Sequence, residues 1–347
     1  MIVINHGKDW SKITYDSLAA SNIALKSGMS VSIKPNLVVS RPASDGATTH
    51  PEVVEGIIQY LQDSGIRHIN IIESSSIGDS TKKAFAVCGY EALQKKYNVS
   101  LIDLKNDSVI KHKHNGLEIS ICKTALETDF LINVPVLKSH CQTRMTCCLK
   151  NLKGCIPDSE KRRFHTIGLH SPIAALNALI KTHFCVVDGI CGDLTFEEGG
   201  TPVEANRVIV GENPLMVDSF CAGLIGYQPE EIEHLQLARQ MGVGQFVSPE
   251  TKIIELNPDN KPLKAAKSNM IERYQRLVNE DSACSVCYSA LIFALHRKGG
   301  RTNKKVHIGQ GFKGKAGEGI GIGNCANGFS TCIEGCPPKA VDIMKQL

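Results

Sequence analysis

Five cysteines near the C-terminus have spacings typical of metal or cluster ligands. They are Cys284, Cys287, Cys325, Cys332 and Cys336. The first two form a CxxC pair, and the ending CIEGCPP matches the C-x3-C-P end of bacterial ferredoxin motifs. We therefore predict a 4Fe-4S cluster. A four-cysteine zinc ribbon is the alternative, although such ribbons usually carry two CxxC pairs.

A 4Fe-4S cube needs four cysteine ligands, which is one fewer than this region offers. The predicted cluster ligands are Cys284, Cys287, Cys325 and Cys336. Cys332 is the alternative ligand, because its spacing to Cys336 is ferredoxin-like. The glycine-rich stretch 309–324 would let backbone N–H groups approach the sulfides of the cluster.

The densest run of polar residues is NVPVLKSHCQTRMTCCLKNLKGCIPDSEKRRFH, residues 133–165. It holds many basic side chains and few acidic ones, which suits an anionic small-molecule substrate. A helix is predicted over 143–152, so that Thr143, Thr146 and Lys150 would share one face. A lysine there would act as a point charge toward a carboxylate or phosphate. The predicted catalytic residues are Lys138, His140, Lys150 and His165.

Further polar side chains follow the predicted strands or lie in the same block. The predicted substrate-binding residues are Lys34, Asn36, Thr49, His50, Glu73, Thr143, Thr146, Asn151, Lys153 and Asp188. Because open α/β sheets bind ligands outside the carboxyl ends of their strands, we expect these residues to converge with Lys138 and His140. For Thr49, a role as helix N-cap is an equal alternative to substrate binding. For His50, a purely structural role is an equal alternative. A solvated basic surface is the alternative for Lys161–Arg163.

The chain up to about residue 250 alternates apolar strands with amphipathic helices. Residues 49–65 are predicted as a helix, because apolar residues recur at helical spacing and Gly65 follows as a stop signal. The flanking runs 31–39 and 68–76 are predicted strands, and this β-α-β order implies a parallel pair. Further helices are predicted at 79–97, 171–181 and 213–226, and strands at 99–104, 129–140, 184–190 and 206–211. We predict an α/β fold with a mostly parallel sheet and flanking helices.

The length of 347 residues suits about two domains. We predict an α/β substrate domain over 1–250, a helical connection over 251–280 and a small 4Fe-4S module over 281–347. No apolar run of about 18 residues occurs and no signal-peptide pattern is seen, so we expect no membrane contact and a cytoplasmic location. A net charge of +4 and 5% aromatic residues argue against nucleic acid as a partner.

The chain has 14 cysteines, and without a secretion signal they are expected as reduced thiols. Four of them lie in the polar block: Cys141, Cys147, Cys148 and Cys155. They form either a second metal or redox site or, as we favour, part of the apolar core. Neighbouring residues on a helix point about 100° apart, so Cys147 and Cys148 are not expected to face one pocket.

Over about residues 30–225 the chain resembles the domain-of-unknown-function family DUF362. The motifs that carry this resemblance are KPNLV (34–38), ATTHPEVVEGII (47–58), NVPVLKSH (133–140), TCCLKNLKGCIP (146–157), FH (164–165) and VVDGI (186–190). Several members of the family carry a ferredoxin-like module at the C-terminus, and the cysteine pattern here is similar to it. A fainter similarity to nickel-pincer lactate racemases implies that Lys138, His140 and His165 would hold a substrate or cofactor. This similarity is not taken to imply a nickel cofactor in the present chain.

Three functions are compatible with these features. The first is an oxidoreductase that passes single electrons from a 4Fe-4S cluster to an anionic substrate, with a ferredoxin or other electron donor as partner. The second is a non-redox isomerase or lyase that uses the cluster as a Lewis acid or structural element. The third is a ferredoxin-like electron carrier without its own substrate. We favour the first over the carrier, because a carrier does not need the Lys/His/Thr constellation.

Overall fold

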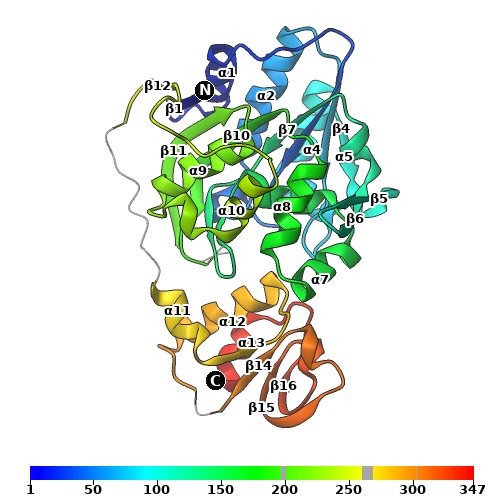
Figure 1. Cartoon of the computed structure of the whole chain (residues 1–347), viewed down its shortest axis with the longest axis vertical. Coiled ribbons are helices and arrows are strands. Elements are labelled where there is room, and N and C mark those ends of the chain that lie inside the picture. The colour runs from blue at the N-terminus through cyan, green and yellow to red at the C-terminus, as the bar shows by residue number, and fades with distance from the viewer. Residues whose placement is uncertain (197–200, 260–268, 303) are drawn as a thin grey trace.

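The computed structural model describes residues 1–196, 201–259, 269–302 and 304–347. It comprises a large unit built on an eight-stranded sheet and a small unit built on a four-stranded sheet (Figure 1). The order of strands in the large sheet is β12-β1-β11-β10-β7-β2-β3-β4. Their bounds are β1 (Ile2–His6), β2 (Ser30–Pro35), β3 (His68–Glu73), β4 (Ser100–Asp103), β7 (Phe130–Val134), β10 (Phe184–Asp193), β11 (Pro202–Gly211) and β12 (Ile253–Leu256).

The large sheet is mostly parallel. β7 pairs in parallel with β10 and β2, and β3 and β4 continue the parallel order. β11 runs antiparallel to both of its neighbours, β1 and β10, whereas β12 is parallel to β1. These parallel pairs, with helices between the strands, confirm the predicted α/β fold. Helical crossovers between strands place those strands in parallel.

Helices cover both faces of this sheet (Figure 1). The first face packs on α1 (Trp10–Ala20), α2 (Pro51–Asp63), α3 (Thr81–Val87) and α4 (Tyr90–Tyr97). The second packs on α6 (Cys148–Asn151), α7 (Asp158–Thr166), α8 (His170–Leu179), α9 (Pro214–Leu224) and α10 (Glu233–Gln240), and on the hairpin β5 (Val109–His114) and β6 (Leu117–Cys122) with α5 (Lys123–Glu127). In β1, β7, β10 and β11, successive apolar residues alternate between the two cores, as a pleated strand requires.

Two helix predictions need local correction. The predicted helix 49–65 has His50 rather than Thr49 at its N-cap, and the helix itself begins at the following proline. The predicted helix 79–97 is divided into α3 and α4. Gly89 separates them with a φ of 83°, a left-handed backbone conformation that glycine adopts without steric cost.

The polar block folds differently from the prediction. The predicted strand 129–140 is split into β7 and β8, and the predicted helix 143–152 is wrong. In its place are a short strand, the four-residue helix α6 and a 3-10 turn. The new strands, β8 (Lys138–His140) and β9 (Arg144–Thr146), form an antiparallel hairpin. The carboxylate of Asp218 on α9 accepts hydrogen bonds from the N–H groups of Cys148 and Leu149, which fixes the start of α6 at this point.

The small unit has its own parallel sheet and core. Its strands are β13 (Val278–Glu280), β14 (Val306–Ile308), β15 (Ala316–Ile322) and β16 (Gly328–Ile333), and its helices are α11 (Asn269–Gln275), α12 (Ser285–Arg297) and α13 (Ala340–Gln346). The predicted connection 251–280 thus contains strands at both of its ends, and its residues 260–268 lie outside the described part of the chain. The domain boundaries stay predictions.

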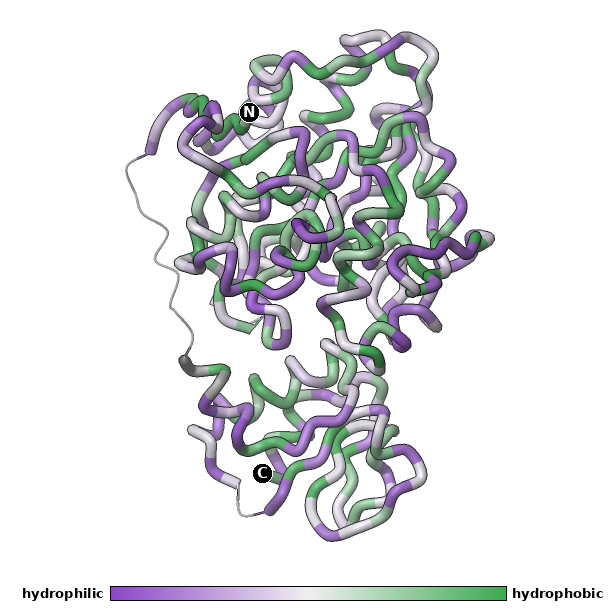
Figure 2. Tube along the Cα trace, in the orientation of Figure 1, coloured by the Kyte–Doolittle hydropathy of each residue, from purple (hydrophilic) through white to green (hydrophobic). Residues whose placement is uncertain are grey.

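The two units are in direct contact. Gln142 of the large unit donates to the carbonyl of Ala283 at 3.0 Å and accepts from the hydroxyl of Ser285 at 2.8 Å. Ser289 donates to the carbonyl of Phe196. Figure 2 shows hydrophobic segments running through both units, while the projecting β5–β6 hairpin is largely hydrophilic. No helix within the described ranges is long and apolar enough to cross a membrane.

Candidate functional site

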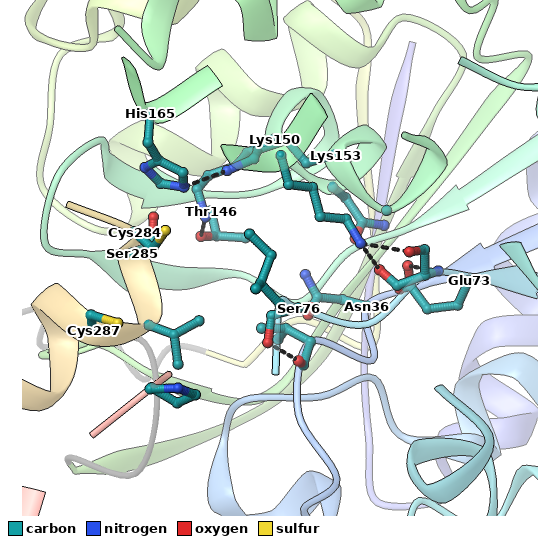
Figure 3. A pocket seen from close by; sticks show the side chains of 18 of the residues that line it. Asn36, Glu73, Ser76, Thr146, Lys150, Lys153, His165, Cys284, Ser285 and Cys287 are labelled. Atoms are coloured by element: carbon teal, nitrogen blue, oxygen red, sulfur yellow. Dashed lines mark hydrogen bonds between the residues drawn. The ribbon is translucent and has the colours of Figure 1, made fainter. Parts of the chain in front are cut away.

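A pocket lies where the two units meet, and we call it the junction pocket (Figure 3). Eight predicted site residues of the large unit line it: Lys34, Asn36, Glu73, Thr146, Lys150, Asn151, Lys153 and His165. Three predicted cluster ligands of the small unit line its other side: Cys284, Cys287 and Cys336. The junction pocket therefore combines basic groups and thiols that are far apart in sequence.

A buried ion pair lies at one wall of the pocket. The ammonium of Lys34 donates to Glu73 Oε2 at 2.9 Å, to the Pro35 carbonyl at 2.8 Å and to Asn151 Oδ1 at 3.1 Å. Both charged side chains are almost completely buried. A Cβ at Gly154 would collide with this pair, so glycine is needed there. Lys34 is thus neutralised within the protein, and its main effect is to orient Glu73 and Asn151.

Among the other basic groups of the pocket, Lys150 and His165 are buried and Lys153 is half-buried. Lys150 Nζ donates to the hydroxyl of Thr146 at 3.3 Å, and Lys153 Nζ lies 3.3 Å from His165 Nε2. The Oδ1 atom of Asn36 is buried without a hydrogen-bond partner among the described residues. Because an amide can turn by 180°, Asn36 is able to offer either its oxygen or its NH₂ to a ligand. Such a lining suits an oxyanion.

Lys161 also lines the pocket, although it was not among the predicted binding residues. Its ammonium donates to the Ser74 carbonyl at 2.9 Å, the Ser75 carbonyl at 2.8 Å and Asp158 Oδ1 at 3.1 Å. Burial lowers the pKa of Lys161, and the Asp158 carboxylate only partly offsets this. A solvated surface is therefore wrong for Lys161, while Arg162 is exposed.

Other predicted site residues lie outside the lining of the junction pocket. These are Thr49, His50, Lys138, His140, Thr143 and Asp188. His50 Nδ1 lies 2.8 Å from Asp188 Oδ2, and Lys138 Nζ donates to the Ala47 carbonyl at 2.9 Å. His140 Nδ1 accepts from the backbone N–H of Thr143 at 3.0 Å. The expected convergence therefore brings together only part of the predicted set.

The His50–Asp188 contact changes the titration of the imidazole. Burial lowers the pKa of His50, but the charge of Asp188 and its hydrogen bond outweigh burial, so the net pKa is raised. The backbone N–H of His50 donates to the same oxygen at 2.7 Å. This pair fixes the start of α2, and that is a structural role.

A second cavity, lined by the small unit and by Arg162 of the large unit, contains four cysteines, and we call it the cysteine cavity. They are Cys284, Cys287, Cys325 and Cys336. Cys332 lies on β16 and is not part of the lining. Burial raises the pKa of Cys287, and the neighbouring thiols of Cys284, Cys336 and Cys325 raise it further. The structure thus gathers four of the five thiols.

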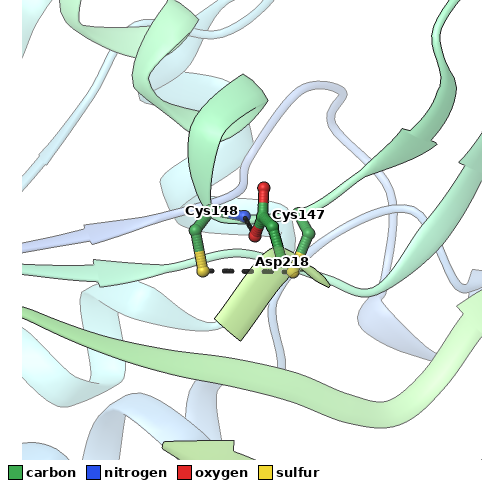
Figure 4. A group of neighbouring side chains, drawn as sticks. All are labelled: Cys147, Cys148 and Asp218. Atoms are coloured by element: carbon green, nitrogen blue, oxygen red, sulfur yellow. Dashed lines mark hydrogen bonds between the residues drawn. The ribbon is translucent and has the colours of Figure 1, made fainter. Parts of the chain in front are cut away.

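The cysteines of the polar block fall into different environments. Cys147 precedes α6 with extended backbone, and its Sγ lies 4.0 Å from that of Cys148, so the expectation that the two diverge is wrong (Figure 4). Cys155 is fully buried, and burial raises its pKa to about 12. Cys141 lies in the core of the small unit.

Comparison with known proteins decides the family. A family model described as "Domain of unknown function (DUF362)" matches residues 31–223, more than half of the chain. The chain belongs to the DUF362 family. This confirms the resemblance inferred from the motifs. The DUF362 match ends within α9, so the four cysteines of the cysteine cavity lie beyond it.

This DUF362 protein shows similarity to two further proteins. It is 26% identical to the thylakoid-associated protein sll1697 of Synechocystis sp. over 246 residues, which are 71% of this chain and 69% of that protein. It is also similar to the lactate racemase apoprotein from Thermoanaerobacterium thermosaccharolyticum, at 15% identity and a TM-score of 0.41. That match covers 69% of this chain and 56% of the racemase chain.

Proposed function

We propose that this DUF362 protein is an iron-sulfur oxidoreductase that acts on an anionic small molecule bound in the junction pocket. One observation carries the proposal. Cys284, Cys287 and Cys336 line both the cysteine cavity and the junction pocket. A cluster held by these thiols would therefore lie directly against the bound molecule, with no intervening protein layer.

The cysteine cavity suits a 4Fe-4S cluster better than a single zinc ion. Tetrahedral zinc, with Zn–S bonds of about 2.3 Å, holds its sulfurs about 3.8 Å apart. No three of the sulfurs around the cysteine cavity lie within 4.8 Å of one another. Gly309, Gly323 and Gly335 also line the cavity with positive φ, so its wall is built partly of bare backbone. These features support Cys284, Cys287, Cys325 and Cys336 as the cluster ligands.

The residues of the pocket would bind and protonate the substrate. When bound, the cluster would supply single electrons. Lys150 and Lys153 provide positive charge for a carboxylate or phosphate, and Asn36 provides a further hydrogen bond. Lys150 and His165 are the groups able to donate protons that balance the added electrons. We propose a ferredoxin or another one-electron donor as partner and the cytoplasm as location.

The carrier alternative is less well supported by this geometry. A carrier needs an exposed cluster edge but no ligand pocket. Here Lys150, Lys153 and His165 line a pocket beside the thiols, and a carrier does not need such a pocket. No contact among the described residues favours the isomerase or lyase over the oxidoreductase.

The test is elemental analysis of anaerobically purified protein, with electron paramagnetic resonance after dithionite reduction. About four iron and four sulfide per chain with a reduced-cluster signal is the expected result. Cys284→Ser should lose most of the iron, whereas Cys332→Ser, the matched control, should retain it. Zinc without sulfide would contradict the proposal, and so would an intact cluster whose signal and redox turnover respond to no carboxylate or phosphate anion.

A further inference from the structure

A second group of potential metal ligands lies inside the large unit, apart from the junction pocket (Figure 4). The sulfurs of Cys147 and Cys148 and a carboxylate oxygen of Asp218 all lie within 4.8 Å of one another. The two sulfurs are 4.0 Å apart. All three side chains are fully buried. Neither the proposed cluster nor the proposed substrate makes use of them.

Backbone hydrogen bonds hold Asp218 beside the two cysteines. Asp218 accepts hydrogen bonds from the N–H groups of Cys148 at 2.7 Å and Leu149 at 3.0 Å, so its carboxylate cannot swing away. Each carboxylate oxygen retains a lone pair for a further partner. Cys221 follows Asp218 by three residues on α9 and therefore lies on the same helix face. Its thiol is fully buried on that face and is the candidate for the fourth ligand.

We propose that Cys147, Cys148 and Asp218 bind one zinc ion in a structural site, with Cys221 completing the coordination. Two thiolates on tetrahedral zinc lie about 3.8 Å apart, close to the separation found here. Thiolates with one carboxylate form a donor set that zinc accepts. All four side chains are fully buried, and structural zinc sites are closed in the same way. On binding, the thiols lose their protons to solvent, and no electrons are exchanged.

The ion would tie α9 to the segment that enters the junction pocket. Cys147 and Cys148 lie between Thr146 and Lys150, both of which line that pocket. Zinc would thus act on the pocket by positioning this segment and not by touching a substrate. Because the site is closed, zinc should enter during folding and resist chelators afterwards.

The test uses the full-length protein produced with added zinc and then dialysed against a chelator. We expect about one zinc per chain to remain, with a zinc-edge X-ray absorption spectrum of mixed sulfur and oxygen ligation and Zn–S near about 2.3 Å. An all-sulfur shell, or no retained zinc, would overturn the proposal without any variant being needed.

Variants then locate the ion. The double variant Cys147→Ser/Cys148→Ser should lose the zinc. Cys155→Ser, a buried thiol of the same segment outside the group, should retain it. Cys284→Ser/Cys287→Ser should also retain it, because those residues belong to the cysteine cavity. Two results would overturn the assignment. One is zinc that is retained by Cys147→Ser/Cys148→Ser, and the other is zinc that is lost only from Cys284→Ser/Cys287→Ser. If the first variant does not fold, the wild-type absorption spectrum decides.

Discussion

At the scale of single residues, the Lys34–Glu73 pair is the most constrained feature of the pocket. Its two charges are out of water and satisfied by one another and by neighbouring carbonyl and amide groups. A buried pair of this kind is destabilising when it is broken, because the remaining charge has no compensation. The pair therefore links the stability of the fold to the shape of the junction pocket.

Glu73→Gln should lower the free energy of unfolding by about 3–5 kcal/mol, since it leaves the ammonium of Lys34 buried without its counter-charge. Urea denaturation followed by circular dichroism measures this. Glu118→Gln is the matched control, because Glu118 pairs with Lys111 in an exposed ion pair. This substitution should lower the free energy of unfolding only slightly. Equal effects of the two substitutions would show that the buried pair has no special role.

His50 should make stability depend on pH. Its pKa is raised in the folded state, so its contribution is complete below the unfolded value of 6.5 and is lost as pH rises through the raised value. The difference in unfolding free energy between wild type and His50→Gln should therefore be larger at about pH 5.5 than at about pH 8.5. Urea titrations at both pH values measure this. A difference that grows with pH would contradict the Asp188 pairing.

At the scale of elements, the loop between β3 and α3 supports the small unit. Gly78 has a φ of 89°, and a Cβ there would collide with the carbonyl of Cys336. The loop thus packs directly against the backbone of a predicted cluster ligand. This contact fits glycine and leaves no room for a side chain.

Gly78→Ala should reduce bound iron and sulfide, because it displaces the loop that carries Cys336. Gly65→Ala is the matched control: Gly65 has a similar φ of 83°, but a Cβ there would meet nothing within 4 Å. Both substitutions should lose about 1 kcal/mol of stability from backbone strain, and only the first should lose iron. Equal iron content in the two variants would show that this contact does not position the cluster.

At the scale of the whole molecule, the junction pocket exists only because the two units meet. We therefore expect an anion bound by the large unit to be sensed by a cluster in the small unit. In wild type, adding phosphate or a small carboxylate should shift the reduced-cluster resonance signal. Lys150→Ala should abolish this shift with the iron content unchanged, whereas Lys123→Ala, an exposed lysine of the same unit, should preserve it. If the shift persists in Lys150→Ala, the anion that the cluster senses does not bind in the junction pocket.

The sequence by itself determined the features that depend on local or repeating patterns. The alternation of apolar strands and amphipathic helices predicted the mostly parallel α/β sheet, because periodicity reports which face of an element is buried. Motifs at fixed spacing identified DUF362 over the same residues that the family model matches. Cysteine spacing singled out the thiols that line the cysteine cavity.

Only the tertiary structure decided how distant parts combine. The helix predicted over 143–152 failed because the β8–β9 hairpin and the cap from Asp218 override local helical periodicity. The burial of Lys161 depends on carbonyl groups nearly ninety residues earlier in the chain. The pairing of Cys147 and Cys148 with Asp218 likewise joins segments separated by about seventy residues. Such contacts follow from packing of the whole chain, and no local pattern encodes which distant group will satisfy a buried charge or donor.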